Sequence, residues 1–233
     1  MRLIAPPVLF DADDWLVLDK PAGLLTTPAP DAADSLVGAA QRQRPKSACW
    51  HPLSRLDAMV TGAVVFALSD WAIAKAVEVR EAGEYRRWYA ALAGAPVDGD
   101  EGEWRWRIED DPRRRHHRRC GDGPSSVEAT TRWRRLGSGA RATMLGLVPV
   151  TGRTHQIRVH AAKAGLPLLG DVAYGGARRI TSDDGSVVSI ARVMLHARAV
   201  CVPGRASPVV SPWPADFAAL RESLVPDALP WPP

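Results

Sequence analysis

The chain has 233 residues, 46% of them hydrophobic, which suffices for a sizeable core, and it contains no apolar run of the roughly 20 residues that span a membrane. Its formal net charge of +4 is carried almost entirely by arginine, which suits RNA phosphates and bases, although a GC-rich coding sequence would produce the same bias. The cysteines are dispersed and the start lacks a leader pattern, so we expect a soluble, cytoplasmic protein without disulfides, metal or cofactor.

The first third of the chain has the pattern of short strands separated by turns. Strand-like segments occupy residues 8–10, 15–19 and 63–68. A helix is expected after the third strand, with Ser69 or Asp70 as its cap and Gly83 at its end. Ile73 and Val77 share one face of that helix.

A polar excursion interrupts the strand patterns in the middle of the chain. Residues 85–94 have a strand pattern, whereas residues 98–126 are polar and charged and contain the basic run 113–119. Because apolar strand patterns resume at residue 129, we expect a loop or hairpin in place of a linker. The basic run could contact RNA phosphates, or it could be a disordered solvated loop.

A predicted helix with a polar start follows a strand at residues 142–150. Thr154 can cap this helix. A helix N-terminus offers free backbone N–H groups, so Arg153, Thr154 and His155 could bind a phosphate or a carboxylate. Arg158, one turn on, would be partly buried and would then need an anionic partner. The alternative is an ordinary capped helix with a solvated basic face.

A second polar constellation precedes the strand at residues 63–68. Arg55 and Asp57 lie at the start of this apolar segment, where burying their charges would be costly unless they faced a site. A lone aspartate close to a glycine is more often a turn or cap residue. The residues by themselves therefore leave both interpretations open.

These segments, in this order, resemble the RluA-type family of RNA pseudouridine synthases. The matching stretches are Leu18–Leu24, Arg55–Asp57, Thr61–Gly62, Thr151–His160, Gly165–Asp171, Tyr174–Gly175 and Leu195–Ala197. Residues 151–175 match the family's third motif almost letter for letter. The resemblance implies an isomerase that converts uridine to pseudouridine in rRNA or tRNA without a cofactor.

The resemblance also implies the fold class, α+β, with a long mixed, mostly antiparallel sheet flanked by helices and loops. We expect a single catalytic domain over residues 1–233, without the N-terminal RNA-binding domain of many relatives. Its core would cover about residues 8–225, its basic excursion about 98–126, and a Pro-rich tail 226–233. The expected partner is a structured RNA stem-loop, with no membrane and no obligate protein partner, and we expect a monomer.

Site residues follow from the same resemblance. It implies that Asp57 attacks the ribose and that Arg158 pairs with it and favours its ionised form. It implies that Arg55 fills the gap left by a flipped-out uridine. Further substrate contacts are expected from Lys20, Arg153, Thr154, His155 and Gln156.

The family also has an aromatic residue that packs on the flipped uracil, usually a tyrosine in a K-x-Y-x-A-x-V-x-G pattern. Counting back from Gly94 places Trp88 there, with Tyr89 beside it. Tryptophan can stack on a base but supplies no phenol for proton transfer. Ser54 and Val60 also depart from the family pattern, so a non-catalytic RNA-binding protein or RNA chaperone is a second hypothesis. A glycoside or nucleoside hydrolase is a third, and it lacks a second placed carboxylate.

Overall fold

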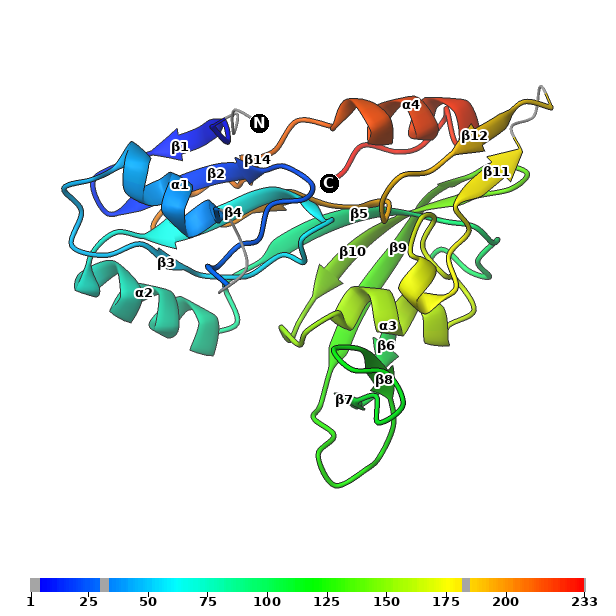
Figure 1. Ribbon diagram of the computed structural model, residues 1–233, viewed down its shortest axis with the longest axis horizontal. Coiled ribbons are helices and arrows are strands. Elements are labelled where there is room, and N and C mark those ends of the chain that lie inside the picture. The colour runs from blue at the N-terminus through cyan, green and yellow to red at the C-terminus, as the bar shows by residue number, and fades with distance from the viewer. Residues whose placement is uncertain (1–4, 30–33, 182–184, 233) are drawn as a thin grey trace. The chain divides into compact units, whose positions relative to one another are not determined.

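The computed structural model describes residues 5–29, 34–181 and 185–232. Its elements, labelled in Figure 1, belong to two compact units. The first unit comprises Met1–Arg87 and Ala197–Pro212, and the second comprises Trp88–His196 and Trp213–Pro233. The predicted chain start at residues 1–4 and the last residue of the predicted tail lie outside the described residues.

Strands and helices alternate in the first unit. Its elements are β1 (Val8–Asp11), β2 (Trp15–Lys20), α1 (Leu36–Gln43), β3 (His51–Pro52), β4 (Thr61–Ala67), α2 (Asp70–Glu81) and β14 (Val209–Val210). The strand β13 (Leu195–Val200) enters this unit at Ala197. Neighbouring strands follow the order β1-β2-β4-β13, with antiparallel pairing of β2 to both β1 and β4.

The second unit contains the longer strands and the polar excursion. Its elements are β5 (Arg87–Ala93), β6 (Glu101–Arg105), β7 (Ile108–Asp110), β8 (Arg118–Cys120), β9 (Thr130–Ser138), β10 (Thr143–Pro149), α3 (Gln156–Lys163), η1 (Val172–Tyr174), β11 (Arg179–Thr181), β12 (Val187–Ser189), the start of β13 and α4 (Ala215–Leu224). Neighbouring strands follow the order β13-β5-β10-β9-β6, and the β5–β10, β10–β9 and β9–β6 pairs are antiparallel. The strands β7 and β8 form a separate antiparallel hairpin.

These elements confirm the predicted α+β fold with a mostly antiparallel sheet. Part of the predicted polar excursion forms the β7–β8 hairpin, whereas residues 101–105 of the same stretch are the strand β6 of the large sheet. The sequence prediction omitted the helices α1 and α4. Ser35 caps α1 by accepting a hydrogen bond from Gly38 N at 3.1 Å, and α4 buries Phe217, Leu220 and Leu224.

The predicted helix after β4 is α2, and small side chains form most of its buried face. Ser69 caps it by accepting a hydrogen bond from Ala72 N at 3.2 Å, as expected. The buried residues of this helix are Ala72, Ala76 and Val79, whereas Val77 is 46% exposed. Small alanines let the helix pack closely on the strands, and the bulkier valine points to solvent. No helix of the described residues is long and apolar enough to cross a membrane.

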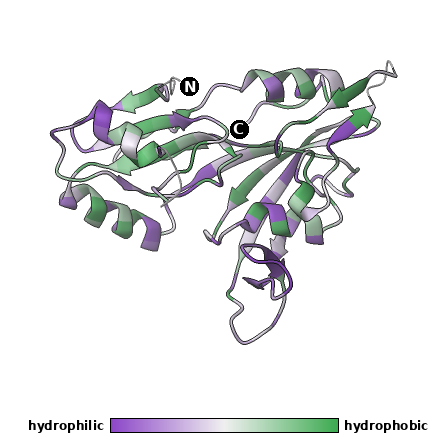
Figure 2. Cartoon of the chain, viewed as in Figure 1, coloured by the Kyte–Doolittle hydropathy of each residue, from purple (hydrophilic) through white to green (hydrophobic). Residues whose placement is uncertain are grey.

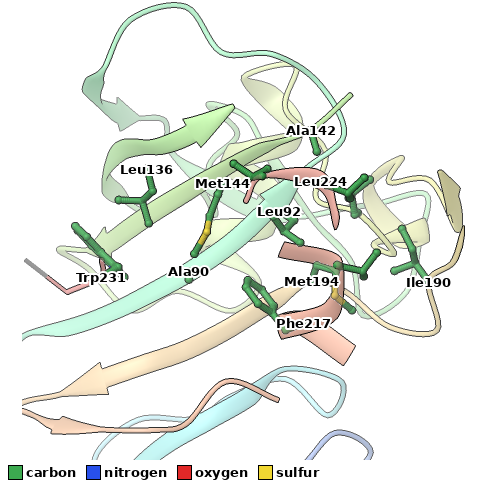
Figure 3. Packing of buried hydrophobic residues seen from close by; sticks show 13 residues of the cluster. Ala90, Leu92, Leu136, Ala142, Met144, Ile190, Met194, Phe217, Leu224 and Trp231 are labelled. Carbon is green, nitrogen blue, oxygen red and sulfur yellow. The ribbon is translucent and has the colours of Figure 1, made fainter. Parts of the chain in front are cut away.

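One face of the sheet in the second unit is covered by a buried hydrophobic cluster (Figure 3). Leu92 of β5 and Met144 of β10 lie opposite each other in register and pack there with Phe217 of α4. Trp231 joins this cluster and is 8% exposed. A Cβ added at Gly146 would lie 2.7 Å from the Trp231 indole, so the glycine leaves room for this ring. Trp231 of the predicted Pro-rich tail is therefore part of the core in this unit, whereas Pro226, Asp227, Leu229 and Pro230 are exposed.

Candidate functional site

The loop that carries Asp57 lies just before β4 in the first unit and is pinned on both sides of the aspartate. Leu56 N donates to Thr26 Oγ1 at 3.0 Å, and Thr26 Oγ1 donates to Leu56 O at 2.9 Å. Ala58 O accepts hydrogen bonds from Lys20 Nζ at 2.8 Å and from Gly23 N at 2.9 Å. The peptides before and after Asp57 are thus held by four hydrogen bonds, which fixes the backbone from which its half-buried side chain projects.

Lys20 is buried and binds backbone carbonyls, which the sequence did not indicate. It is 1% exposed, and its ammonium also donates to Pro21 O at 2.9 Å and to Leu24 O at 2.6 Å. An ammonium has three protons, and three backbone carbonyls take them. Within its unit, Lys20 thus holds the turn at Pro21–Leu24 to the aspartate loop, and its expected contact with a substrate stays a prediction.

Gly62, one residue into β4, allows a close approach of two strands in the same unit. Its φ is +120°, and a Cβ there would lie 2.3 Å from Ala197 O. No other residue type fits this position without moving the backbone. Arg55 is exposed in the loop two residues before Asp57, and its expected role in filling the space of a flipped nucleotide stays a prediction.

In the second unit, α3 is fastened to β9 by a buried amide. Gln156 is 4% exposed, and its Nε2 donates to Thr130 O at 2.9 Å and to Thr131 Oγ1 at 3.0 Å. Its Oε1 accepts from Arg153 N at 3.0 Å and from Thr151 Oγ1 at 2.6 Å. All four hydrogen-bonding positions of the amide are used inside the protein. Gln156 therefore anchors α3, and its expected contact with a substrate stays a prediction.

His160 completes this attachment one turn further along α3. It is fully buried, with Nδ1 3.0 Å from Thr131 Oγ1 and Nε2 3.0 Å from Trp106 O. A carbonyl can only accept, so Nε2 carries the proton and Nδ1 accepts from the threonine hydroxyl. Burial lowers the pKa of His160, against the opposing effect of the Trp106 hydrogen bond. A neutral imidazole thus holds α3 against the sheet.

The loop before α3 has a special backbone conformation at His155. Its φ is +56°, and it is the N-cap residue of α3 but makes no side-chain capping bond. The expected capping by Thr154 is corrected, because the Gln156 side chain binds the loop instead. His155 Nδ1 lies 2.7 Å from Tyr174 Oη. Non-glycine residues with positive φ persist where surrounding contacts enforce them, often at functional sites.

Arg153 and Thr154 are exposed and line a polar cavity of about 290 Å³. The other wall comes from the base of the β7–β8 hairpin and includes Glu109 and Arg118. Arg153 Nε donates to Glu128 O at 3.0 Å, which orients the guanidinium. The predicted contacts of Arg153, Thr154 and His155 with a substrate stay predictions, and their loop lies beside a concave surface.

Arg158 has an anionic partner within its own unit. Its Nε and Nη2 each donate to a carboxylate oxygen of Asp171 at 2.7 Å. Asp171 is 2% exposed, and the guanidinium also lies over Tyr174, 4.9 Å from the ring centroid. The sequence indicated that a buried Arg158 needs a carboxylate, and Asp171 meets that need. The pairing of Arg158 with Asp57 stays a prediction.

Trp88 and Tyr89 point to opposite faces of the sheet, because side chains alternate along a strand. Trp88 packs against the hydrophobic cluster that includes α4. Tyr89 lies opposite Leu147 of β10, which lies opposite Trp133 of β9. Thr131 lies two residues before Trp133 on β9, so their side chains are on the same face, and Thr131 hydrogen-bonds to α3. Tyr89, which shares this face, therefore points to the side of the sheet that α3 covers. Trp88 therefore lies on the face that packs against α4 and Tyr89 on the α3 face, and the expected stacking of Trp88 on a flipped uracil stays a prediction.

Three residues of this arrangement had no role in the sequence prediction. Asp171 and Tyr174 lie in a stretch whose resemblance to a family motif was evident, but their contacts with α3 were not. Nothing in the sequence pattern indicated the role of Thr26, because it depends on hydrogen bonds to Leu56, 30 residues away.

Comparisons with known proteins agree with this picture. Residues 14–163 match the family model described as RNA pseudouridylate synthase. The chain is 32% identical to the ribosomal large subunit pseudouridine synthase D of Nitrosomonas europaea over 93% of this chain and 64% of that protein. It is 32% identical to the dual-specificity RNA pseudouridine synthase RluA of Vibrio vulnificus over 82% of this chain and 74% of that protein.

The fold agrees as well. The solved structure of human RNA pseudouridylate synthase domain containing 1 superposes with a TM-score of 0.72 and covers 97% of this chain and 90% of that one, at 23% identity. Since the family model covers more than half of the chain, and a relative above 30% identity is covered over more than two thirds of its length, the chain belongs to the RNA pseudouridylate synthase family of isomerases.

Proposed function

We propose that this chain isomerises specific uridines of rRNA or tRNA to pseudouridine. The observation that carries the proposal is the match to the family model over residues 14–163, which contain both Asp57 and Arg158. A relative named for the large ribosomal subunit supports rRNA as one substrate class. The chain spans about 64% of that relative's length, so the substrate of the whole protein is part of the proposal.

The proposed reaction moves the uracil base from one glycosidic bond to another. The bond between ribose C1′ and uracil N1 breaks, the base turns, and a bond between C1′ and C5 forms. The hydrogen on C5 leaves as a proton, and N1 gains a proton, so the atoms balance. The sugar becomes electron-poor during the exchange, and a carboxylate on that face stabilises it or bonds to it.

Asp57 is the carboxylate in this proposal. The hydrogen bonds of Leu56 and Ala58 support it, because a pinned backbone presents a nucleophile without a further entropic cost. In this proposal Arg158 pairs with Asp57, and its bidentate bond to Asp171 fixes the orientation of the guanidinium.

Tyr89 is the aromatic residue that packs on the flipped uracil in this proposal. It is 5% exposed, and it lies on the sheet face that carries α3. A tyrosine can stack on a base and can also exchange a proton through its phenol, which tryptophan cannot. The family usually has a tyrosine in this role, so a stacking Tyr89 agrees with the family pattern, whereas a stacking Trp88 would depart from it.

The proposal is tested by mapping pseudouridine in the RNA of cells that lack the protein. Restoring the wild-type gene returns the missing sites, whereas Asp57→Asn does not. Asp13→Asn is the matched control, because it removes an equally charged, exposed aspartate from the same unit. If deletion removes no pseudouridine, the enzyme proposal fails, and the hypothesis of a non-catalytic RNA-binding protein gains support. Release of free uracil would support the hydrolase.

A further inference from the structure

A groove of about 570 Å³ lies between the β7–β8 hairpin, α3 and η1 in the second unit. Its lining includes Arg114 and Arg119 of the hairpin, Lys163 in the last turn of α3, and Tyr174 of η1. These segments lie next to one another in Figure 1, and we call the surface the hairpin groove. None of the predicted catalytic residues is among those that line it in the described part of the chain.

The charges around the hairpin groove are only partly balanced. Arg118 forms an ion pair with Asp110, and Arg119 Nη2 lies 2.6 Å from Glu109 Oε1. For Arg114 and Lys163, by contrast, residues 5–29, 34–181 and 185–232 offer no carboxylate within 4.0 Å. Asp111 also lines the groove and carries one opposing charge, while Arg114 and Lys163 carry the two positive charges of the described lining that no ion pair balances.

The tip of the hairpin has a defined conformation. Asp111 N donates to His117 O at 3.0 Å, and His117 N donates to Arg114 O at 3.0 Å. Arg114 Nη1 reaches across to Ala173 O at 2.8 Å, which fixes its guanidinium against η1. Arg118 N donates to Tyr174 Oη at 3.0 Å at the base of the tip. A cation held in place loses little conformational freedom when it binds an anion.

We propose that the hairpin groove binds the sugar-phosphate backbone of a helical stem of the RNA, at a position separate from the reacting uridine. The proposal rests on the proposed function, because it takes RNA as the substrate. Arg118 lines both the groove and the polar cavity beside Arg153 and Thr154, so the two concave surfaces adjoin. Figure 2 shows the hairpin as strongly hydrophilic. A stem whose strand enters the cavity has its phosphates beside Arg114 and Lys163.

An acidic protein segment is the competing occupant, and the chemistry favours RNA. Guanidinium and ammonium groups in an ordered, polar groove match a regular series of phosphates, and each contact releases a counterion. The logarithm of the RNA affinity then falls with the logarithm of salt concentration, by about 0.9 per phosphate contact in a duplex. Two contacts contribute about 1.8 to that slope.

The test compares two double variants with the same change in charge. Arg114→Gln with Lys163→Gln neutralises the groove, and Arg134→Gln with Arg141→Gln neutralises two exposed arginines elsewhere in the unit. Binding of a fluorescein-labelled RNA stem-loop of about 20 nucleotides is measured by anisotropy between 50 and 200 mM salt. The groove variant reduces the salt slope by about 1.8, so its loss of affinity over this fourfold range is about 12-fold smaller than that of the wild type.

The control variant changes the slope by less than half as much. Arg114→Lys keeps the charge and the slope, which separates charge from the contact to Ala173. Equal salt slopes of RNA affinity for the groove variant and the control variant would overturn the proposal. It would also be overturned if the groove variant lost affinity for polyglutamate but kept its affinity for the stem-loop. These measurements need no turnover, so an absence of pseudouridine would refute the proposed function while a changed slope still upheld the groove.

Discussion

Replacing Thr26 with valine removes one oxygen atom and leaves the shape of the side chain almost unchanged. That oxygen accepts from Leu56 N at 3.0 Å and donates to Leu56 O at 2.9 Å. Thr26 is 3% exposed and Leu56 is 6% exposed, so water does not replace either bond readily. Each buried backbone group left without a partner costs about 1–3 kcal/mol, and the extra methyl of valine offsets about 1 kcal/mol. Because Thr26→Val leaves two such groups, it should lower the free energy of unfolding by about 1–5 kcal/mol, with a central value of about 3 kcal/mol.

Thr26→Ser is the matched control, because it keeps the hydroxyl and loses only a methyl. Its expected cost is about 1 kcal/mol. Urea unfolding followed by tryptophan fluorescence compares the two variants with the wild type. If the valine and serine variants agree within about 0.5 kcal/mol, the hydrogen bonds to Leu56 do not hold the loop and the reasoning fails.

The same pair of variants connects stability to the site. Under the proposed function, Thr26→Val releases the peptide before Asp57 and lowers kcat, whereas Thr26→Ser retains most of it. Thr26 is buried and does not bind RNA in this account, so KM should change little. A rise in KM at constant kcat would contradict a positioning role for this threonine.

Three further predictions concern other positions. Gly62→Ala should cost about 2 kcal/mol or more, and Gly83→Ala only about 1, because a Cβ at Gly62 meets Ala197 O while none crowds Gly83. Since burial lowers the pKa of His160, this imidazole takes up a proton near pH 6.5 in the unfolded chain but stays neutral there in the native state. Stability should fall as pH drops below 6.5, by up to about 1.4 kcal/mol per pH unit, and less steeply in His160→Asn. Under the proposed function, Tyr89→Phe should lower single-turnover pseudouridine formation about 100-fold, and Trp88→Phe less than about 2-fold.

The sequence predicted most of the strands, because each has a short apolar or alternating pattern. It omitted α1 and α4, whose few inward-facing residues are spread over only two or three turns. It placed Ile73 and Val77 of α2 on one face, whereas in the structure Ile73 packs against a buried cluster and Val77 is exposed. Local patterns identify an element more readily than they identify the side that packs, since packing depends on the partner.

For the site as well, local motifs could be read from the sequence, whereas contacts between distant residues could not. Motif order indicated Asp57 and the loop before α3, but no spacing could show that the Lys20 ammonium binds Ala58 O, 38 residues away. Counting along a motif indicated Trp88 as the aromatic position but does not show which sheet face a side chain occupies. Strand register places Trp88 and Tyr89 on opposite faces, and on this basis Tyr89 is the residue proposed to stack on the base.

The central claim is that the Asp57 carboxylate carries out the isomerisation. Purified wild-type protein, Asp57→Asn and Asp13→Asn are each incubated with unmodified rRNA and tRNA transcripts, and the nucleosides are then quantified by mass spectrometry. Pseudouridine is expected from the wild type and from Asp13→Asn, and none above background from Asp57→Asn, with all three proteins folded by circular dichroism. Formation by Asp57→Asn at the wild-type rate would contradict this claim.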